Sequence, residues 1–191
     1  MNTGNKLLFF FVIFSFFPFL TGCLPVIIAA GAGASYLSTT PEALAKVDAY
    51  FADIDRSIQR RFNKTSTESQ TKKQLEYKKS QGLIIELVGY ELSPKEVKPG
   101  DKVTVTIQYA VLGATPDSGI EVEENKTLWF GDHQTAVLAN DKVSRKNGTW
   151  ESVLTFQVPV KVQAGKYKVK QSISSNDKVF QTFDSFEIAS K

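Results

Sequence analysis

The sequence predicts a mainly β chain in which an amphipathic helix precedes an antiparallel β-sandwich. From Gly82 onward, β-branched and aromatic residues are interrupted by glycine, proline, asparagine and aspartate, which is typical of an all-β domain. Between Val103 and Val111, apolar side chains alternate with polar ones, as in a strand with one buried face. Before Gly82, apolar residues recur instead at spacings of three and four, which is the period of a helix.

The first residues have the pattern of a secretory signal. Lys6 supplies a positive charge, an apolar run extends from Leu7 to Phe19, and two small residues follow. The run of about 13 residues is too short to span a bilayer, which takes roughly 20. We therefore expect residues 1–22 to be a removable signal peptide. Without Lys6 the net charge falls from +3 to about +2, too little to predict a nucleic-acid partner.

The signal ends in Leu20-Thr21-Gly22-Cys23, which resembles the lipobox of bacterial lipoproteins. The resemblance implies that diacylglycerol is attached to the Cys23 sulfur, that the chain is cut just before this residue, and that the new amino group receives an N-acyl lipid such as palmitate. The lack of aspartate at position 24 implies the outer rather than the inner membrane. A single cysteine agrees with this interpretation because it cannot form an internal disulfide. The alternative is an ordinary signal peptide with a cysteine nearby.

Residues 23–40 are expected to form a lipid-anchored tether. The stretch from Leu24 to Ser35 begins with apolar residues and continues with alternating alanine and glycine, and it is too short to cross a membrane. The small residues could instead form a face for close helix packing.

A helix is predicted from position 41 to position 62. Thr40 can cap its first turn, Pro41 suits the first helical position, and Glu42 complements the helix dipole. Its apolar residues form one stripe: Leu44, Val47, Phe51, Ile54, Ile58 and Phe62. This spacing favours contact with another helix, from a second copy or another envelope protein, over docking on the membrane or on the chain's own β domain.

The segment from Asn63 to Lys73 has no apolar residue and predicts a break. A second helix is predicted from about Glu68 to Ser80, because Thr67 and Gln70 have the spacing of a capping box. Residues 41–80 are thus expected to be a helix and a polar, basic linker. The lysine and arginine residues of this linker indicate a solvated stalk, or attraction to lipid headgroups or an acidic envelope polymer.

About eight strands are expected in a β domain at 82–189, and Asn147-Gly148 gives the strongest hairpin signal. The segments Val97-Lys98-Pro99-Gly100-Asp101, Gly165-Lys166-Tyr167 and Phe186-Glu187-Ile188 resemble bacterial immunoglobulin-like domains. The resemblance implies an immunoglobulin-like sandwich in which Tyr167 forms a tyrosine corner. The mature chain has no paired cysteines, so a fibronectin-like variant fits as well.

No catalytic residue, metal site or cofactor is predicted, apart from the lipid on Cys23. The one histidine, His133, falls in an expected turn, and no G-x-S-x-G motif accompanies it. The acidic residues between Asp117 and Glu124 do not have the spacing of an EF-hand loop.

Three aromatic residues are candidates for a ligand platform: Trp129, Phe130 and Trp150. The alternative is that the tryptophans belong to the core. The leading hypothesis is a non-enzymatic, lipid-anchored envelope protein that binds or assembles another protein through its helix and immunoglobulin-like domain. A carbohydrate- or peptidoglycan-binding module is the alternative, and an enzyme is the least favoured.

Overall fold

The computed structural model describes residues 40–115, 118–176 and 178–190. The signal peptide at 1–22, Cys23 and the tether up to residue 39 lie outside the described residues. Within the described part of the chain, no helix has both the length and the apolar composition to cross a membrane.

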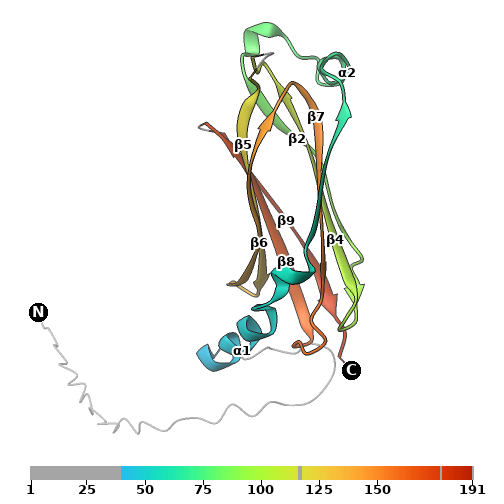
Figure 1. The fold of residues 1–191 in the computed structure, drawn as a ribbon, viewed down its shortest axis with the longest axis vertical. Coiled ribbons are helices and arrows are strands. Elements are labelled where there is room, and N and C mark those ends of the chain that lie inside the picture. Colours follow the sequence, from blue (N-terminus) through green and yellow to red (C-terminus); the bar gives the residue numbers. More distant parts are fainter. Residues whose placement is uncertain (1–39, 116–117, 177, 191) are drawn as a thin grey trace, which may run out of the picture. The chain divides into compact units, whose positions relative to one another are not determined.

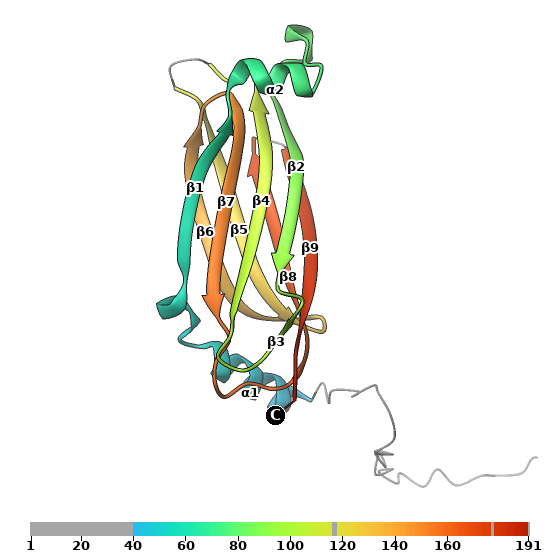
Figure 2. The ribbon, with the colours of Figure 1, turned by 90° about the vertical axis from the view of Figure 1, so that its right-hand side faces the viewer.

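Two β-sheets and two short α-helices make up the described residues (Figures 1 and 2). The helical elements are α1 (Pro41–Phe51), α2 (Glu68–Gln74) and two 3-10 turns at Ile54–Ser57 and Lys79–Gln81. The strands are β1 (Gln59–Ser66), β2 (Ile84–Ser93), β3 (Glu96–Val97), β4 (Lys102–Leu112), β5 (Ile120–Phe130), β6 (His133–Arg145), β7 (Gly148–Gln157), β8 (Gly165–Ser175) and β9 (Lys178–Ile188). The prediction of a mainly β fold with a preceding helix is confirmed.

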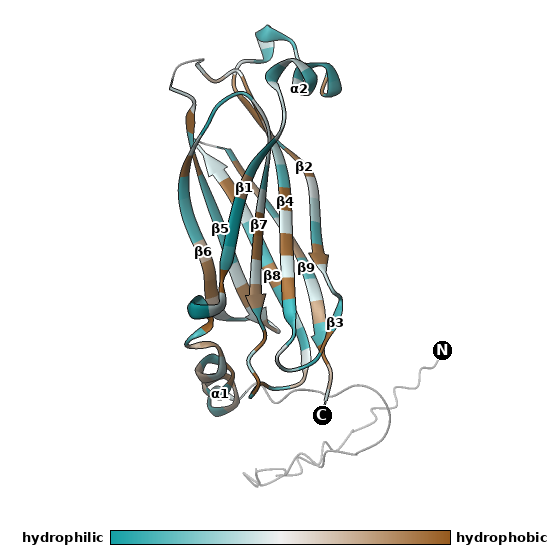
Figure 3. Cartoon of the chain, turned by 45° about the vertical axis from the view of Figure 1, so that its right-hand side comes forward, coloured by the Kyte–Doolittle hydropathy of each residue, from teal (hydrophilic) through white to brown (hydrophobic). Residues whose placement is uncertain are grey.

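One sheet has four antiparallel strands in the order β1-β7-β4-β2, and the other has five in the order β3-β9-β8-β5-β6. The short β3 runs parallel to β9, so the five-stranded sheet is mixed. Figure 3 shows hydrophobic and hydrophilic residues alternating along β4, as the sequence predicts. The apolar side chains of both sheets meet in two buried clusters. In the larger cluster, ring contacts link Phe51, Phe130, Phe156, Tyr167 and Phe186.

The predicted helix at 41–62 is wrong beyond Phe51. Thr40 caps α1 through its side chain, as expected, but the chain is extended at Ile58 and then forms β1. Residues 59–66 pair with β7 over almost their whole length. Ile58 and Phe62 match the helical spacing of the apolar residues before them only by coincidence. The hydrogen bonds between β1 and β7 decide the structure of this segment, because pairing with a distant strand overrides local helix preference.

The apolar stripe packs inside the chain's own core. Val47, Phe51 and Ile54 are almost fully buried there, and Leu44 and Ile58 pack against the same cluster. Phe62 lies on β1, below the guanidinium group of Arg145 at 4.9 Å. The stripe is therefore occupied within the molecule, and the expectation that it contacts a separate helix is wrong.

The expected break at 63–73 is also wrong, because this segment contains the end of β1 and all of α2 except its last residue. The capping box that starts α2 is present, with Thr67 and Gln70 bonded to each other as predicted, although the helix ends at Gln74. Since β1 belongs to the four-stranded sheet, the β structure begins near residue 59 and not at 82.

The Asn147-Gly148 pair does not form a hairpin. It joins β6 of one sheet to β7 of the other, so the two strands it connects are not partners. The Asn147 side chain instead holds the loop at Ala114, accepting from its backbone N–H at 2.9 Å and donating to its carbonyl at 3.0 Å. Asparagine suits this position because its side-chain amide can both accept from the N–H of Ala114 and donate to the carbonyl of Ala114, which would otherwise be buried without partners.

Candidate functional site

The three predicted platform residues do not share one surface. Trp129 lies half-buried on the outer face of β5, whereas Phe130 points into the core, with its ring 4.9 Å from that of Tyr167. Trp150 lies on β7 of the other sheet, 4.7 Å from the guanidinium group of Arg145. Consecutive strand residues point to opposite faces, and β5 and β7 belong to different sheets, so only Trp129 is available to the platform.

Strand register assembles a different set of side chains around Trp129. In an antiparallel pair, directly opposed residues share a face of the sheet. The outward residues of β6, β5, β8 and β9 therefore form three neighbouring rows across the five-stranded sheet: Gln134, Trp129, Lys168 and Ser185; Val137, Thr127, Lys170 and Phe183; Asn140, Asn125, Ser172 and Gln181.

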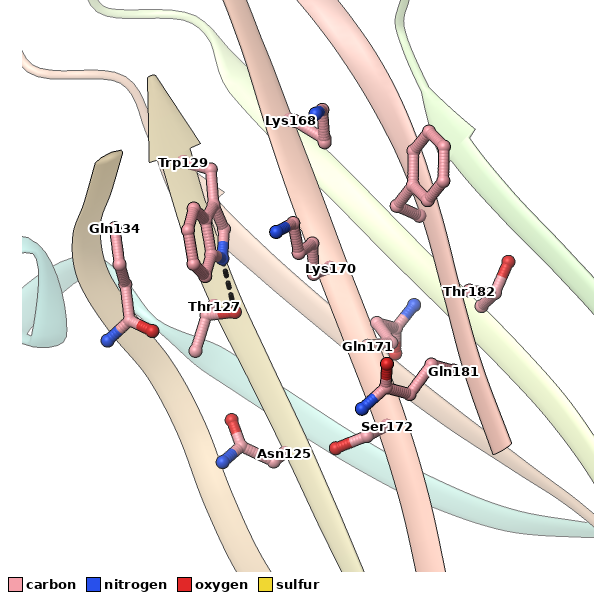
Figure 4. Close-up of a pocket in the computed structure, with 11 residues that line it drawn as sticks. Asn125, Thr127, Trp129, Gln134, Lys168, Lys170, Gln171, Ser172, Gln181 and Thr182 are labelled. Carbon is pink, nitrogen blue, oxygen red and sulfur yellow. Dashed lines mark hydrogen bonds between the residues drawn. The ribbon is translucent and has the colours of Figure 1, made fainter. Parts of the chain in front are cut away.

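Nine of these twelve residues, all except Val137, Asn140 and Ser185, line a shallow groove together with Gln171 and Thr182. Its volume of about 650 Å³ is within the usual size of a ligand site. Figure 4 shows the groove residues of β5, β6, β8 and β9, with Trp129 and Lys170 on neighbouring strands. The strand β6 shifts register twice here, once opposite Thr127 and once beside Trp129. Such bulges bend a sheet and are common next to binding sites.

Trp129 is fixed in place by two contacts. Its indole N–H donates a hydrogen bond of 2.8 Å to the hydroxyl of Thr127, two residues earlier on the same strand. The ammonium group of Lys170 lies 3.4 Å from the centroid of the indole ring, a close cation–π contact. On the same face of β8, the ammonium group of Lys168 lies 5.3 Å from the ring of Phe183 on β9, and Phe183 is 65% exposed.

The polar side chains of the groove are available to a ligand. Asn125, Gln134, Ser172 and Gln181 make no side-chain hydrogen bond to any described residue. An amide group both donates and accepts, and a hydroxyl does the same, so this set can bind a ligand rich in hydroxyl groups. Two aromatic rings beside it supply apolar contact area.

A second group of ionisable side chains is sealed between the two sheets. Glu124, Lys126 and Arg145 are 5% exposed or less. The Glu124 carboxylate accepts hydrogen bonds from the Tyr109 hydroxyl at 2.6 Å, from Arg145 at 2.8 Å and from Lys126 at 3.3 Å. This buried ion cluster connects β4, β5 and β6 but is closed to ligands, so its role is in holding the sheets together.

The pKa values of the buried ion cluster follow from burial and charge together. Burial acts to raise the pKa of Glu124, but the charge of Lys126 and the hydrogen bonds from Tyr109 and Arg145 outweigh it, so the pKa lies below the ordinary 4.5. Burial lowers the pKa of Lys126, against the opposing pull of Glu124. Burial raises the pKa of Tyr109, and the Glu124 charge adds to this effect.

The expected turn histidine has a partner. His133 begins β6, and its Nε2 lies 2.9 Å from the carboxylate of Asp48 on α1. Among the described residues, no group of three or more histidine, cysteine, aspartate and glutamate side chains is arranged to hold a metal ion. Of the acidic group noted in the sequence, Glu124 belongs to the buried ion cluster and Glu121 lies 3.8 Å from Lys142.

Sequence reasoning missed Lys168, Lys170 and Phe183. The pattern Lys166-Tyr167-Lys168-Val169-Lys170 does indicate a strand with a basic outer face, because lysines alternate with buried residues. Nothing in that pattern shows that this face adjoins Trp129, since pairing between distant strands depends on register.

Comparison with known proteins identifies no family. No family model matches the sequence, and no curated protein matches it either. Among solved structures, a β-glucosidase from Listeria innocua in complex with glucose has 19% identity and a TM-score of 0.40 over 56% of this chain, and the match spans only 16% of the glucosidase chain.

Two other solved structures give similar values. The CARDB domain of a Pyrococcus furiosus protein, in complex with di-metal ions, has 15% identity and a TM-score of 0.41, covering 56% of this chain and 94% of the domain. An alkylpurine DNA glycosylase from Pseudomonas fluorescens has 9% identity and a TM-score of 0.40, covering 64% of this chain and 37% of its own. Similarities this slight support no conclusion about function.

Proposed function

We propose that this protein is a lipid-anchored cell-envelope protein that binds a glycan chain, without catalysis, in the groove on the five-stranded sheet. The observation that carries the proposal is the composition of the groove: Trp129 and Phe183 lie beside the side chains of Asn125, Gln134, Ser172 and Gln181, which form no hydrogen bond to any described residue. Aromatic rings pack on the apolar face of a sugar, and amides exchange hydrogen bonds with its hydroxyl groups. The lining residues include no carboxylic acid or imidazole to cleave a glycosidic bond.

The lipid anchor is supported by the sequence alone. Cys23 lies at the end of the apolar run, where a lipobox is meaningful, and two or three acyl chains would hold the protein on a membrane far more firmly than one. The outer membrane is the proposed location. Cys23→Ala should abolish lipidation, and mass spectrometry of the purified chain would reveal an unmodified amino terminus if the proposal is wrong.

We also infer that the two sheets form an immunoglobulin-like sandwich. One sheet is antiparallel and the other is antiparallel apart from β3, which agrees with the two antiparallel sheets of that architecture. The Tyr167 hydroxyl donates a 3.0 Å hydrogen bond to the carbonyl of Gln163, four residues upstream, which supports the tyrosine corner.

A protein partner on the same face is the second candidate. Val137, Val179 and Phe183 are three of the five large apolar side chains that are exposed among the described residues, and all three point outward from the five-stranded sheet. Exposed apolar residues gathered on one face are typical of protein interfaces. The apolar residues of α1 no longer support such a role, because they lie in the core.

Co-sedimentation of the full chain, in detergent, with insoluble peptidoglycan tests the proposal. Phe183→Ala and Trp129→Ala should weaken binding about fivefold or more, since each removes an aromatic contact worth roughly 1 kcal/mol or above. Arg61→Ala, on the outer face of the other sheet, is the matched control and should leave it unchanged.

If all four proteins sediment equally, or none does, the glycan proposal is wrong. If a protein from solubilised membranes then copurifies with this chain in a fixed ratio, and Phe183→Ala abolishes the copurification, the second candidate, a protein partner, is correct.

A further inference from the structure

We infer that the groove selects glycans that carry carboxylate groups over neutral glycans of the same backbone, through Lys168 and Lys170. This inference rests on the proposed function and adds the chemical class of the ligand.

The first support is the charge of the groove. Eleven residues line it, and two of them are lysines while none is aspartate or glutamate. Neither Lys168 nor Lys170 forms an ion pair with any described residue; their ammonium groups rest on aromatic rings. Some other described lysines do form ion pairs, such as Lys95 with Asp184 and Lys126 with Glu124. The groove thus keeps two positive charges free for a ligand.

The second support is the place of Lys170 on the Trp129 ring. With its ammonium 3.4 Å from the ring centroid, Lys170 covers one face of the indole. A neutral sugar that stacks on this face must displace the cation and lose the cation–π attraction without compensation. A sugar that carries a carboxylate can displace the same cation and pair with it at once, because the ammonium needs to move only a short distance.

The third support is that the positive charges of the groove are confined to one end of it. Along β8, Lys168 and Lys170 are separated by one inward residue, so both project from the same face about 6.6 Å apart. Glu123 occupies the same outer face of β5, one row beyond Asn125. Lys142 lies directly opposite Glu123, so this row carries one charge of each sign. The acidic groups of the ligand should therefore lie at the other end of the groove, where Lys168 and Lys170 face no carboxylate among the lining residues.

Calorimetric titration of the full chain in a neutral detergent tests this inference with two matched tetrasaccharides. Chitotetraose, used in its fully N-acetylated form, is neutral, whereas the alternating N-acetylglucosamine and N-acetylmuramic acid tetrasaccharide has the same backbone with two free lactyl carboxylates. We expect the acidic tetrasaccharide to bind about tenfold more tightly at low salt, and the difference to shrink as ionic strength rises above about 0.1 M.

Variants then assign the preference to the two lysines. Lys168→Gln with Lys170→Gln should reduce binding of the acidic ligand to the level of chitotetraose, and Lys170→Arg should retain the preference. Lys142→Gln is the matched control, because Lys142 lies on the same sheet face but is paired with Glu121. A circular dichroism melt checks that each variant is folded.

The outcomes separate the two proposals. If both tetrasaccharides bind equally and with the same salt dependence, the preference for carboxylates is wrong while glycan binding stands. If neither binds to the wild-type chain, glycan binding fails and the preference fails with it. If the acidic ligand is preferred but the double lysine variant keeps that preference, the assignment to Lys168 and Lys170 is overturned.

Discussion

At the scale of single residues, Glu124 is the buried charge on which two cations depend. Glu124→Gln leaves Lys126 and Arg145 in the interior without a carboxylate. We expect it to lower the free energy of unfolding by roughly 3 to 5 kcal/mol, the usual cost of breaking a buried ion pair by removing one partner. Urea unfolding measures the change. Glu151→Gln is the control, because that carboxylate lies on an outer face and should cost about 1 kcal/mol or less.

The same variant gives a pH prediction for the buried ion cluster. Because the pKa of Glu124 in the folded protein lies below its ordinary 4.5, the charge stabilises the fold above that pH, and the stabilisation is lost as the pH falls through the folded-state pKa. The difference in unfolding free energy between wild type and Glu124→Gln should therefore be full near neutral pH and shrink below about pH 4.5. A difference that does not change in acid would contradict the assignment.

His133 provides a smaller test. Its bond to Asp48 joins β6 to α1, but both side chains are partly exposed, so solvent weakens the interaction. His133→Asn should reduce the unfolding free energy by about 0.5 to 1 kcal/mol. A double-mutant cycle with Asp48→Asn isolates the pair, and a coupling energy of zero would show that the contact contributes nothing.

At the scale of secondary-structure elements, α1 belongs to the core. Phe51 is 1% exposed, and its ring lies 5.5 Å from that of Tyr167. Phe51→Ala should cost about 3 to 5 kcal/mol, because a large buried aromatic side chain is lost and a cavity is left. Tyr50→Ala, one residue earlier and 37% exposed, should cost less than about 1 kcal/mol. Equal effects in thermal or urea unfolding would mean that α1 is not anchored through Phe51.

Because β1 belongs to the four-stranded sheet, we expect a fragment without it to unfold differently from a chain that contains it. A fragment of residues 82–189 lacks α1 and β1, and so exposes the edge of β7 and the apolar residues that both elements cover. We expect this fragment to unfold without a cooperative transition, whereas residues 40–191 should unfold cooperatively. Urea titration followed by tryptophan fluorescence compares the two. A sharp transition in the shorter fragment would mean that β1 is dispensable.

Local signals in the sequence predicted elements well where neighbouring residues determine them. Thr40 and Thr67 cap their helices as expected, and the alternation from Val103 to Val111 lies within β4. Long-range pairing could not be predicted in this way. The segment at 59–66 reads as the end of a helix and a polar linker, yet becomes a strand because β7 offers it a ladder of hydrogen bonds.

The candidate site was only partly predictable for the same reason. Trp129 is identifiable as an aromatic residue near a turn, but its neighbours in space come from strands up to about fifty residues away. Trp150 and Phe130 were indistinguishable from it by composition, and only strand assignment and side-chain alternation separate them.

At the scale of the whole molecule, the two helices lie at opposite ends of the sheets (Figures 1 and 2). The chain enters the described region at the α1 end, which follows the proposed lipid anchor and tether in sequence. The groove lies along the side of the molecule, on the outer face of β5, β8 and β9.

The groove can be tested directly, because the protein has two tryptophans in different places. The Trp129 indole N–H donates to Thr127 in the groove. The indole N–H of Trp150, on the other sheet, donates to the carbonyl of Lys146, which lies between β6 and β7. Two-dimensional ¹H–¹⁵N spectra of the chain, titrated with the acidic tetrasaccharide, report on both groups at once. We predict that the Trp129 indole signal shifts with saturation while that of Trp150 stays in place; a shift of Trp150 alone, or of neither signal, would contradict binding in this groove.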